Sequence, residues 1–211
     1  MSLLDFLDKA LVLNGNDAKT KSEVISTISS AVLKHEKLKH MSAEALQSLF
    51  EEREALGTTG IGHGIAIPHC KLDDVDQFVV CLATFPGGVE YEAMDGNPVV
   101  LAVAIVGPKD DNQGYVRLLS EISCIFRNQD NVTEVVSADS PEKILQILES
   151  ETCVVDNTKQ EVEYDLVQVY IQDEEIFDEV VEIFTSFDSM AAVCEVTPLG
   201  NYLSKVPLFA S

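Results

Sequence analysis

The sequence has no tryptophan, no apolar run long enough to span a membrane, and few basic residues. A transmembrane helix needs about 20 mostly apolar residues, so we expect no membrane span. Only 14 lysines and arginines stand against 36 aspartates and glutamates, which gives a net charge of −22. Proteins that bind the phosphate backbone of nucleic acids need clustered cations, so this balance argues against a nucleic-acid partner.

Signals for export and for metal binding are also missing. Residues 1–5 lack the basic region and the apolar core of a signal peptide, which predicts a cytoplasmic protein. The five cysteines form no C-x-x-C pair, which argues against a zinc site. We therefore expect neither a metal ion nor a cofactor.

Charge and polarity divide the chain into two parts. Residues 151–211 carry 13 acidic and two basic residues, which is half of the net charge in well under half of the length. Residues 151–163 are polar without a helical period, which predicts a linker between a domain at 1–150 and a module at 164–211. The second part is too short to bury an adequate core alone.

Four segments of the first part have helical patterns. Asp17 and Ser42 are suitable N-caps for the first two helices, and Gly57 is suited to end the second. Pro141 occupies the first position of the last helix, where a missing N–H costs nothing. The predicted helices cover residues 17–32, 42–57, 115–126 and 141–148.

Three further segments have the composition of strands, namely residues 65–67, 78–85 and 99–106. The last one is almost continuously apolar, which is typical of a strand covered by helices on both faces. The alternation of helices and strands predicts an α/β sandwich in which helices flank a mixed sheet.

A glycine-rich passage precedes the strand at 65–67. Gly60, Gly62 and Gly64 occur at alternate positions, and His69 follows a proline just beyond the strand. Glycines let backbone N–H groups approach a ligand, so the passage is suited to an anion-binding nest. The alternative is a tight connection with a surface histidine. No Gly-Lys-Ser/Thr follows and a strand comes next, which excludes a Walker phosphate loop and a GxGxxG dinucleotide loop.

The stretch from Arg53 to His69 reads REALGTTGIGHGIAIPH. It resembles the signature of the fructose/mannitol-type enzyme IIA domain of the phosphoenolpyruvate-dependent phosphotransferase system, a family that includes the nitrogen-regulatory branch. The resemblance continues through Met94–Val99, Leu118–Ile122 and Ser140–Ile144, so it covers residues 1–150. It implies the type-2 enzyme IIA α/β sandwich.

The resemblance also implies roles for individual residues. His69 is expected to accept a phosphoryl group from a small histidine phosphocarrier protein, since a neutral imidazole offers a nucleophilic nitrogen without a separate base. Arg53 matches the family's active-site arginine, whose guanidinium can donate two hydrogen bonds to phosphoryl oxygens. Without the resemblance, Arg53 would be interpreted as a solvated helix residue. The Thr59 hydroxyl and the N–H groups of the three glycines would complete the anion site.

Two positions depart from the family pattern. The family usually carries a second active-site histidine at the start of the helix after the long buried strand, and here Tyr115 stands at that position. A phenol can donate a hydrogen bond to a phosphoryl oxygen but carries no positive charge. His63 stands where the family more often has asparagine, so it either replaces part of the missing imidazole or is an ordinary loop residue.

Three functions follow from these residues. The first is a regulatory relative of enzyme IIA, whose phosphorylation changes its affinity for regulated target proteins. The second is a sugar-transport component that passes the phosphoryl group to a separate enzyme IIB. The third is a binding module that has lost phosphoryl transfer and keeps only a phosphate or effector pocket.

Residues 164–211 show a strand, helix and strand pattern, which predicts a βαβ module, half of a ferredoxin-like fold. Their last part resembles the end of nitrogen-regulatory P-II-like domains, but no nucleotide-binding loop is recognisable. An apolar helix face in half a fold needs a cover. We therefore expect this module to make a homodimer or homotrimer.

Overall fold

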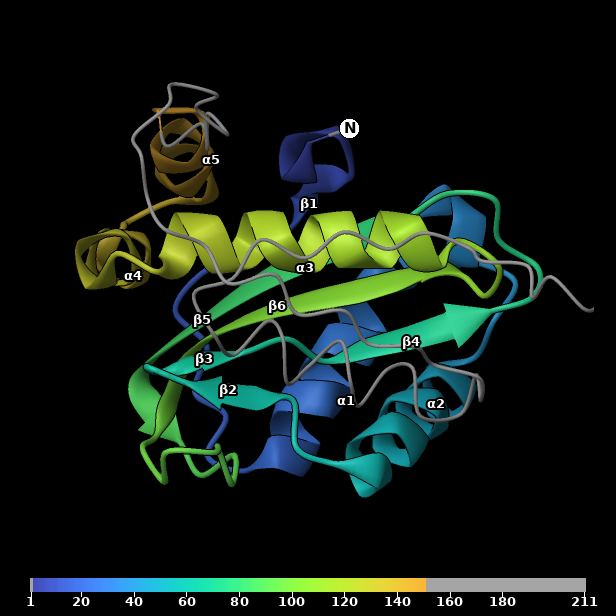
Figure 1. Cartoon of the computed structure of the whole chain (residues 1–211), viewed down its shortest axis with the longest axis horizontal. Helices are drawn as coiled ribbons and strands as arrows, with labels where there is room; N and C mark the ends of the chain where they lie inside the picture. Colours follow the sequence, from blue (N-terminus) through green and yellow to red (C-terminus); the bar gives the residue numbers. More distant parts are fainter. Residues whose placement is uncertain (1, 151–211) are drawn as a thin grey trace, which may run out of the picture.

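The computed structural model describes residues 2–150. The predicted linker at 151–163 and the predicted βαβ module at 164–211 lie outside the described residues. Within residues 2–150, six strands form one mixed sheet with helices on both faces (Figure 1). The strands are β1 (Leu7–Leu13), β2 (Gly60–Gly62), β3 (Ile65–Ala66), β4 (His69–Leu72), β5 (Val79–Val89) and β6 (Val99–Pro108).

The sheet has the order β1-β5-β6-β3-β2, and β4 pairs with β6 as a further strand. β5 and β6 form the central antiparallel pair, while β1 runs parallel to β5, and both β3 and β4 run parallel to β6. The α-helices are α1 (Lys21–Val32), α2 (Ala43–Leu56), α3 (Asn112–Phe126), α4 (Gln129–Ser137) and α5 (Pro141–Ser150). Two short 3-10 helices, η1 (Leu3–Asp5) and η2 (Glu36–Leu38), complete the described elements.

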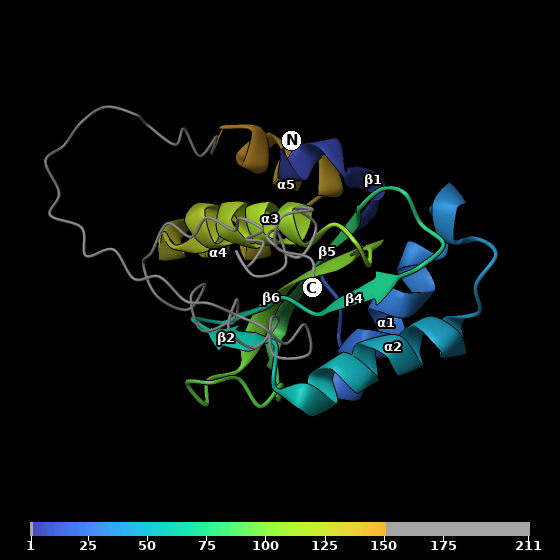
Figure 2. The same cartoon turned by 45° about the vertical axis from the view of Figure 1, so that its right-hand side comes forward.

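Each face of the sheet has its own apolar cluster. On β6, Ala102 and Ala104 pack in one cluster with α1 and α2, whereas Val103 and Ile105 pack in the other with α3, α4 and α5. This alternation arises because successive side chains of a strand point to opposite faces. Figure 2 shows the two helical layers on either side of the sheet. The mixed α/β sandwich expected from the sequence is therefore confirmed.

The helix boundaries differ from expectation at one N-cap. The helix α1 begins after Thr20, whose side-chain oxygen accepts a hydrogen bond from the Glu23 N–H, and the Glu23 carboxylate accepts from the Thr20 N–H. This reciprocal capping box satisfies two N–H groups, so the prediction of Asp17 as the N-cap is wrong. The predictions for Ser42 and Gly57 at the ends of α2 are confirmed.

The short strand at 65–67 is really the first of two. The strand β3 ends at Ala66, and after Pro68 a second strand, β4, begins at His69. Both strands run along β6, with Ile65 opposite Leu101 and His69 opposite Ile105. The chain therefore places His69 inside the sheet rather than in a loop beyond it.

Among residues 2–150, no helix combines the length and the apolar character needed to cross a membrane. The same residues contain no group of three or more histidine, cysteine, aspartate or glutamate side chains placed to hold a metal ion.

Candidate functional site

The centre of the site is the imidazole of His69, at the start of β4. The side chain is enclosed, with an exposed fraction of 4%. The next residue along the strand, Cys70, packs in the cluster under α1 and α2, whereas the rings of His69 and Tyr115 of α3 lie 6.2 Å apart. The strand geometry therefore turns His69 toward the start of α3.

The two ring nitrogens of His69 have different partners. Nδ1 lies 2.9 Å from the carbonyl oxygen of Ile67, which can only accept a hydrogen bond. Nε2 lies 2.9 Å from Nε of Arg53, which can only donate. A consistent assignment places the proton on Nδ1 and a lone pair on Nε2. The neighbours of His69 thus select the neutral tautomer in which Nε2 is the nucleophilic atom.

Arg53 belongs to the last turn of α2, and 7% of its surface is exposed. Besides the bond from Nε to His69, its Nη1 donates to the carbonyl oxygen of Gly57 at 3.2 Å. This second bond satisfies a carbonyl at the helix end, where backbone acceptors have no partner within the helix. The end of α2 therefore fixes the guanidinium against the imidazole. The structure brings these two predicted residues together.

Tyr115 also lies at this site, on the first part of α3. Its hydroxyl donates to the carbonyl oxygen of Cys70 at 2.5 Å, and its ring packs edge-on against Phe78 with a centroid separation of 5.0 Å. The side chain is 3% exposed. A phenol hydroxyl has one proton to donate, and in this structure it is donated to a backbone carbonyl of β4.

Thr59 is fully enclosed and takes part in a different cluster. Its hydroxyl and its backbone N–H both donate to the Glu54 carboxylate, and the hydroxyl lies 3.2 Å from the Tyr91 hydroxyl. Lys21 of α1 lies 3.5 Å from the same carboxylate. The structure therefore places the Thr59 hydroxyl in a polar cluster that fastens the end of α2 to the following strand.

The alternating glycines pack against the chain that leads into β6. A side chain at Gly60 would approach the Ala93 backbone to 2.8 Å. Gly62 and Gly64 have φ angles of +94° and +79°, which L side chains rarely adopt. In this structure the three glycines allow close approach and a turn between β2 and β3.

His63 stands in that turn, exposed, with its N–H bonded to an Asp95 carboxylate oxygen at 2.9 Å. The turn joins the short β2 and β3, and β3 begins opposite Leu101, while His69 lies opposite Ile105. Four residues of strand correspond to roughly 13 Å. The structure does not bring His63 to His69.

Sequence reasoning missed Lys71. It lies two residues after His69 on β4, and its Nζ donates to Oδ1 of Asn112 at 3.0 Å and sits 5.4 Å from the centroid of the Tyr115 ring. Its i, i+2 spacing from the histidine places the two side chains on one face only when the chain there is a strand. An open pocket of about 320 Å³ is lined by Leu49, Glu52, Arg53, Leu56, His69, Cys70 and Lys71.

Cys70 is next to His69 but is not a second nucleophile. Burial raises the pKa of its thiol to about 12. The reactive form of a cysteine is the thiolate, which is negligibly populated near neutral pH at such a pKa. The imidazole is therefore the nucleophile that the site offers.

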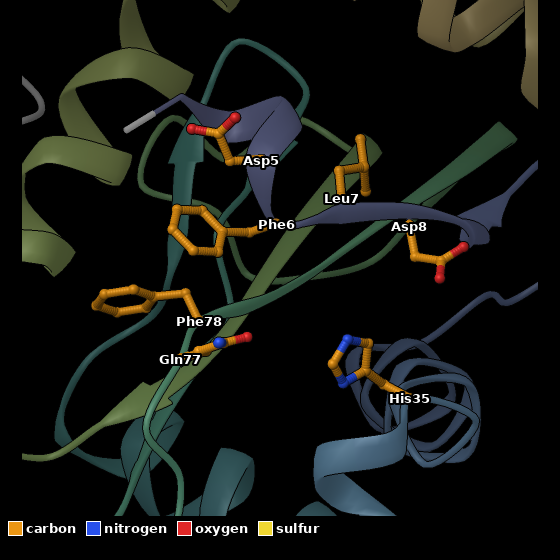
Figure 3. Close-up of a pocket in the computed structure, with 7 residues that line it drawn as sticks. All are labelled: Asp5, Phe6, Leu7, Asp8, His35, Gln77 and Phe78. Carbon is orange, nitrogen blue, oxygen red and sulfur yellow. The ribbon is translucent and has the colours of Figure 1, made fainter.

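A second pocket of about 480 Å³ lies between the start of β1, the chain after α1 and the start of β5 (Figure 3). The rings of Phe6 and Phe78 pack edge to face there, with centroids 5.7 Å apart, while Asp8 and His35 line another part. None of the predicted site residues lines it.

Known proteins resemble the part of the chain that contains His69 and Arg53. The family described as phosphoenolpyruvate-dependent sugar phosphotransferase system, EIIA 2, matches residues 5–151. The chain is 25% identical over 148 residues to a nitrogen regulatory protein of Bradyrhizobium diazoefficiens, covering 70% of this chain and 95% of that protein. It is 28% identical over 148 residues to the fructose-specific EIIABC component of Bacillus subtilis, of which the match spans only 23%.

Two solved structures show the same fold. The nitrogen regulatory protein IIA-Ntr of Neisseria meningitidis has a TM-score of 0.64 at 23% identity, covering 70% of this chain and 99% of that one. A complex of mannitol enzyme IIA and phosphorylated mannitol enzyme IIB from Escherichia coli has a TM-score of 0.58 at 19% identity, covering 67% of this chain and 95% of that one. With the family match extending over 5–151 of 211 residues, this chain belongs to the type-2 EIIA family of the phosphoenolpyruvate-dependent sugar phosphotransferase system.

Proposed function

We propose that this protein accepts a phosphoryl group on Nε2 of His69 from a histidine phosphocarrier protein, and that the phosphorylation state regulates its binding to target proteins. One observation carries the proposal. The Ile67 carbonyl keeps the proton on Nδ1, so Nε2 has a lone pair, and Arg53 donates to this same Nε2. A nucleophile and a phosphate-binding cation are thus already adjacent.

The transfer balances without an added base. The Nε2 lone pair of His69 attacks phosphorus while the N–P bond of the donor breaks, and the donor nitrogen keeps the electron pair. The Nδ1 proton stays in its bond to the Ile67 carbonyl. Arg53 turns its N–H groups from the ring to the phosphoryl oxygens, because a guanidinium forms its stronger hydrogen bonds with anionic acceptors.

The surface beside His69 is suited to a protein donor. The ring is nearly enclosed, so the donor must present its phosphoryl group at the open pocket. Leu56, which lines that pocket, is 61% exposed. Leu49 lines the same pocket, so a docking protein would meet more than one apolar side chain there.

The regulatory function is favoured over sugar transport by one position. Tyr115 supplies no positive charge, and losing a cation weakens stabilisation of a transferring phosphoryl group more than it weakens binding. The names of the relatives include both functions. Enzyme IIB therefore stays the second candidate partner.

The test is incubation with phosphoenolpyruvate, enzyme I and the phosphocarrier protein, followed by intact mass spectrometry. We expect a gain of one acid-labile phosphoryl group. The gain should be lost in His69→Ala and kept in His63→Ala, which removes an exposed histidine away from the pocket.

No gain in the wild-type protein, under conditions that phosphorylate an ordinary enzyme IIA, would favour the inactive binding module. Rapid transfer from the phosphorylated protein to an added enzyme IIB would instead favour the transport function.

A further inference from the structure

We propose that Lys71 is a second cationic residue of the phosphoryl site and binds phosphoryl oxygens together with Arg53 during transfer. This inference rests on the proposed function of His69. It assigns to the strand β4 part of the positive charge that the start of α3 does not supply.

The first argument is position. Lys71 and His69 are alternate residues of β4, so both side chains leave the same face of the strand. Both also line the open pocket next to Arg53. The ammonium and the nucleophilic ring thus belong to one surface.

The second argument is the way in which the lysine is held. Nζ donates to Asn112 at 3.0 Å and lies 5.4 Å from the Tyr115 ring centroid, and both partners belong to the first turn of α3. A lysine side chain normally has much rotamer freedom. These two contacts keep the charge beside the site instead of in bulk solvent.

The third argument is electrostatic. A phosphoryl group brings negative charge to a protein that already carries −22. The hydroxyl of Tyr115 donates its proton to the Cys70 carbonyl oxygen. In this structure Tyr115 therefore offers a phosphoryl group neither a positive charge nor a hydrogen bond. A fixed cation near the developing charge lowers the barrier to transfer, since the charge needs little rearrangement during the reaction.

The test uses the full chain and follows phosphorylation of His69 over time at increasing concentrations of phosphorylated carrier. Lys71→Met keeps length and removes charge, and Lys71→Arg keeps the charge. We expect the maximal rate to fall about 10- to 100-fold in Lys71→Met and to be largely restored in Lys71→Arg. Lys9→Met, which removes an equal charge from the exposed Lys9–Glu142 pair of β1 and α5, should match the wild type.

A spectroscopic measurement separates charge stabilisation from a structural role. Phosphorus NMR of phosphorylated His69 is recorded against pH in the wild type and in Lys71→Met. A bound ammonium favours the deprotonated, more negative form of the phosphohistidine, so the titration should move to higher pH in Lys71→Met and stay in place in Lys9→Met.

The outcomes distinguish a failure of the role of Lys71 from a failure of the proposed phosphorylation of His69. If the wild type takes no phosphoryl group, the proposed function itself fails. If the wild type is phosphorylated and Lys71→Met has the same maximal rate and the same titration, Lys71 has no such role. A change confined to the half-saturating carrier concentration would place Lys71 in docking and would also overturn the proposal.

Discussion

Arg53 and Ile67 hold the imidazole of His69 from its two sides. The backbone carbonyl fixes the proton on one nitrogen, and the guanidinium faces the other. Arg53 can do this because its planar group presents several donors at once, and a second one reaches the Gly57 carbonyl. The geometry around His69 thus depends on the shape of the arginine side chain as well as on its charge.

Arg53→Lys should therefore lower the maximal rate of His69 phosphorylation by about 100-fold, although charge is conserved. A lysine presents a single ammonium, which cannot hold the imidazole and the Gly57 carbonyl in the same geometry. Time-resolved intact mass spectrometry with saturating phosphocarrier measures the rate. The same exchange at Arg117, an exposed residue of α3, is the control. Equal rates in the two variants would contradict the prediction.

The sequence predicted that His69, Arg53 and Tyr115 lie at one site. It placed these residues through a family resemblance, and the structure brings the three side chains together. It could not identify Lys71, because that requires knowing that the chain after Pro68 resumes as a strand. The sequence also could not predict the hydrogen-bond partner of the Thr59 hydroxyl, because that partner, the Glu54 carboxylate, lies across the end of a helix.

The end of α2 is fastened to the sheet by a buried polar cluster. The Glu54 carboxylate accepts from Thr59, from the Tyr91 hydroxyl at 3.1 Å and lies near Lys21. Burial and the adjacent carboxylate raise the pKa of Tyr91 well above its ordinary value, so the hydroxyl stays protonated as a donor. This cluster fixes the turn of helix that carries Arg53.

Tyr91→Phe should lower the free energy of unfolding by about 1–2 kcal/mol, because it leaves a buried carboxylate with one donor fewer. Urea denaturation monitored by circular dichroism measures the change. Glu54→Gln and the double variant complete a double-mutant cycle, with Glu52→Gln on the exposed side of α2 as the control. A coupling energy of zero between Tyr91 and Glu54 would show that the cluster does not act as a unit.

The elements that the sequence predicted best are those whose pattern is simple. The central strands β5 and β6 are nearly continuous apolar runs, and Ser42 caps α2 as expected. The edge strand β1 was missed because Asp8 and Lys9 interrupt its apolar pattern while facing solvent. The helix α4 was missed because polar residues fill its first turn, and its packing against α5 and β5 stabilises it.

The whole chain carries more than twice as many acidic as basic residues, 36 against 14. Such an excess destabilises the compact state through self-repulsion. The ion pairs of the described residues include exposed ones, such as Lys37 with Asp76, and exposed pairs contribute little. Repulsion should therefore exceed attraction over most of the surface.

Raising sodium chloride from about 0.1 M to about 1 M should raise the Tm, since the screening length falls from about 10 Å to about 3 Å. Differential scanning calorimetry at constant pH measures the shift. Replacing sodium chloride with sucrose is the control for effects that do not depend on charge. A Tm that is unchanged or lower at high salt would contradict the prediction.

The homo-oligomer expected from residues 164–211 stays a prediction, which light scattering at micromolar concentration would test.

The two helical layers are synthesised at different times relative to the strands that they cover. The helices α1 and α2 leave the ribosome before β5 and β6, the strands that they cover, whereas α3, α4 and α5 emerge after the described strands are complete. The apolar faces of α1 and α2 must therefore wait while about 50 further residues are added, which takes about 3–10 seconds at ordinary elongation speeds. The later helices can settle directly on a finished sheet. A nascent chain stopped shortly after α2 should accordingly be the one that chaperones hold longest, and the arginine of the site is already present in it.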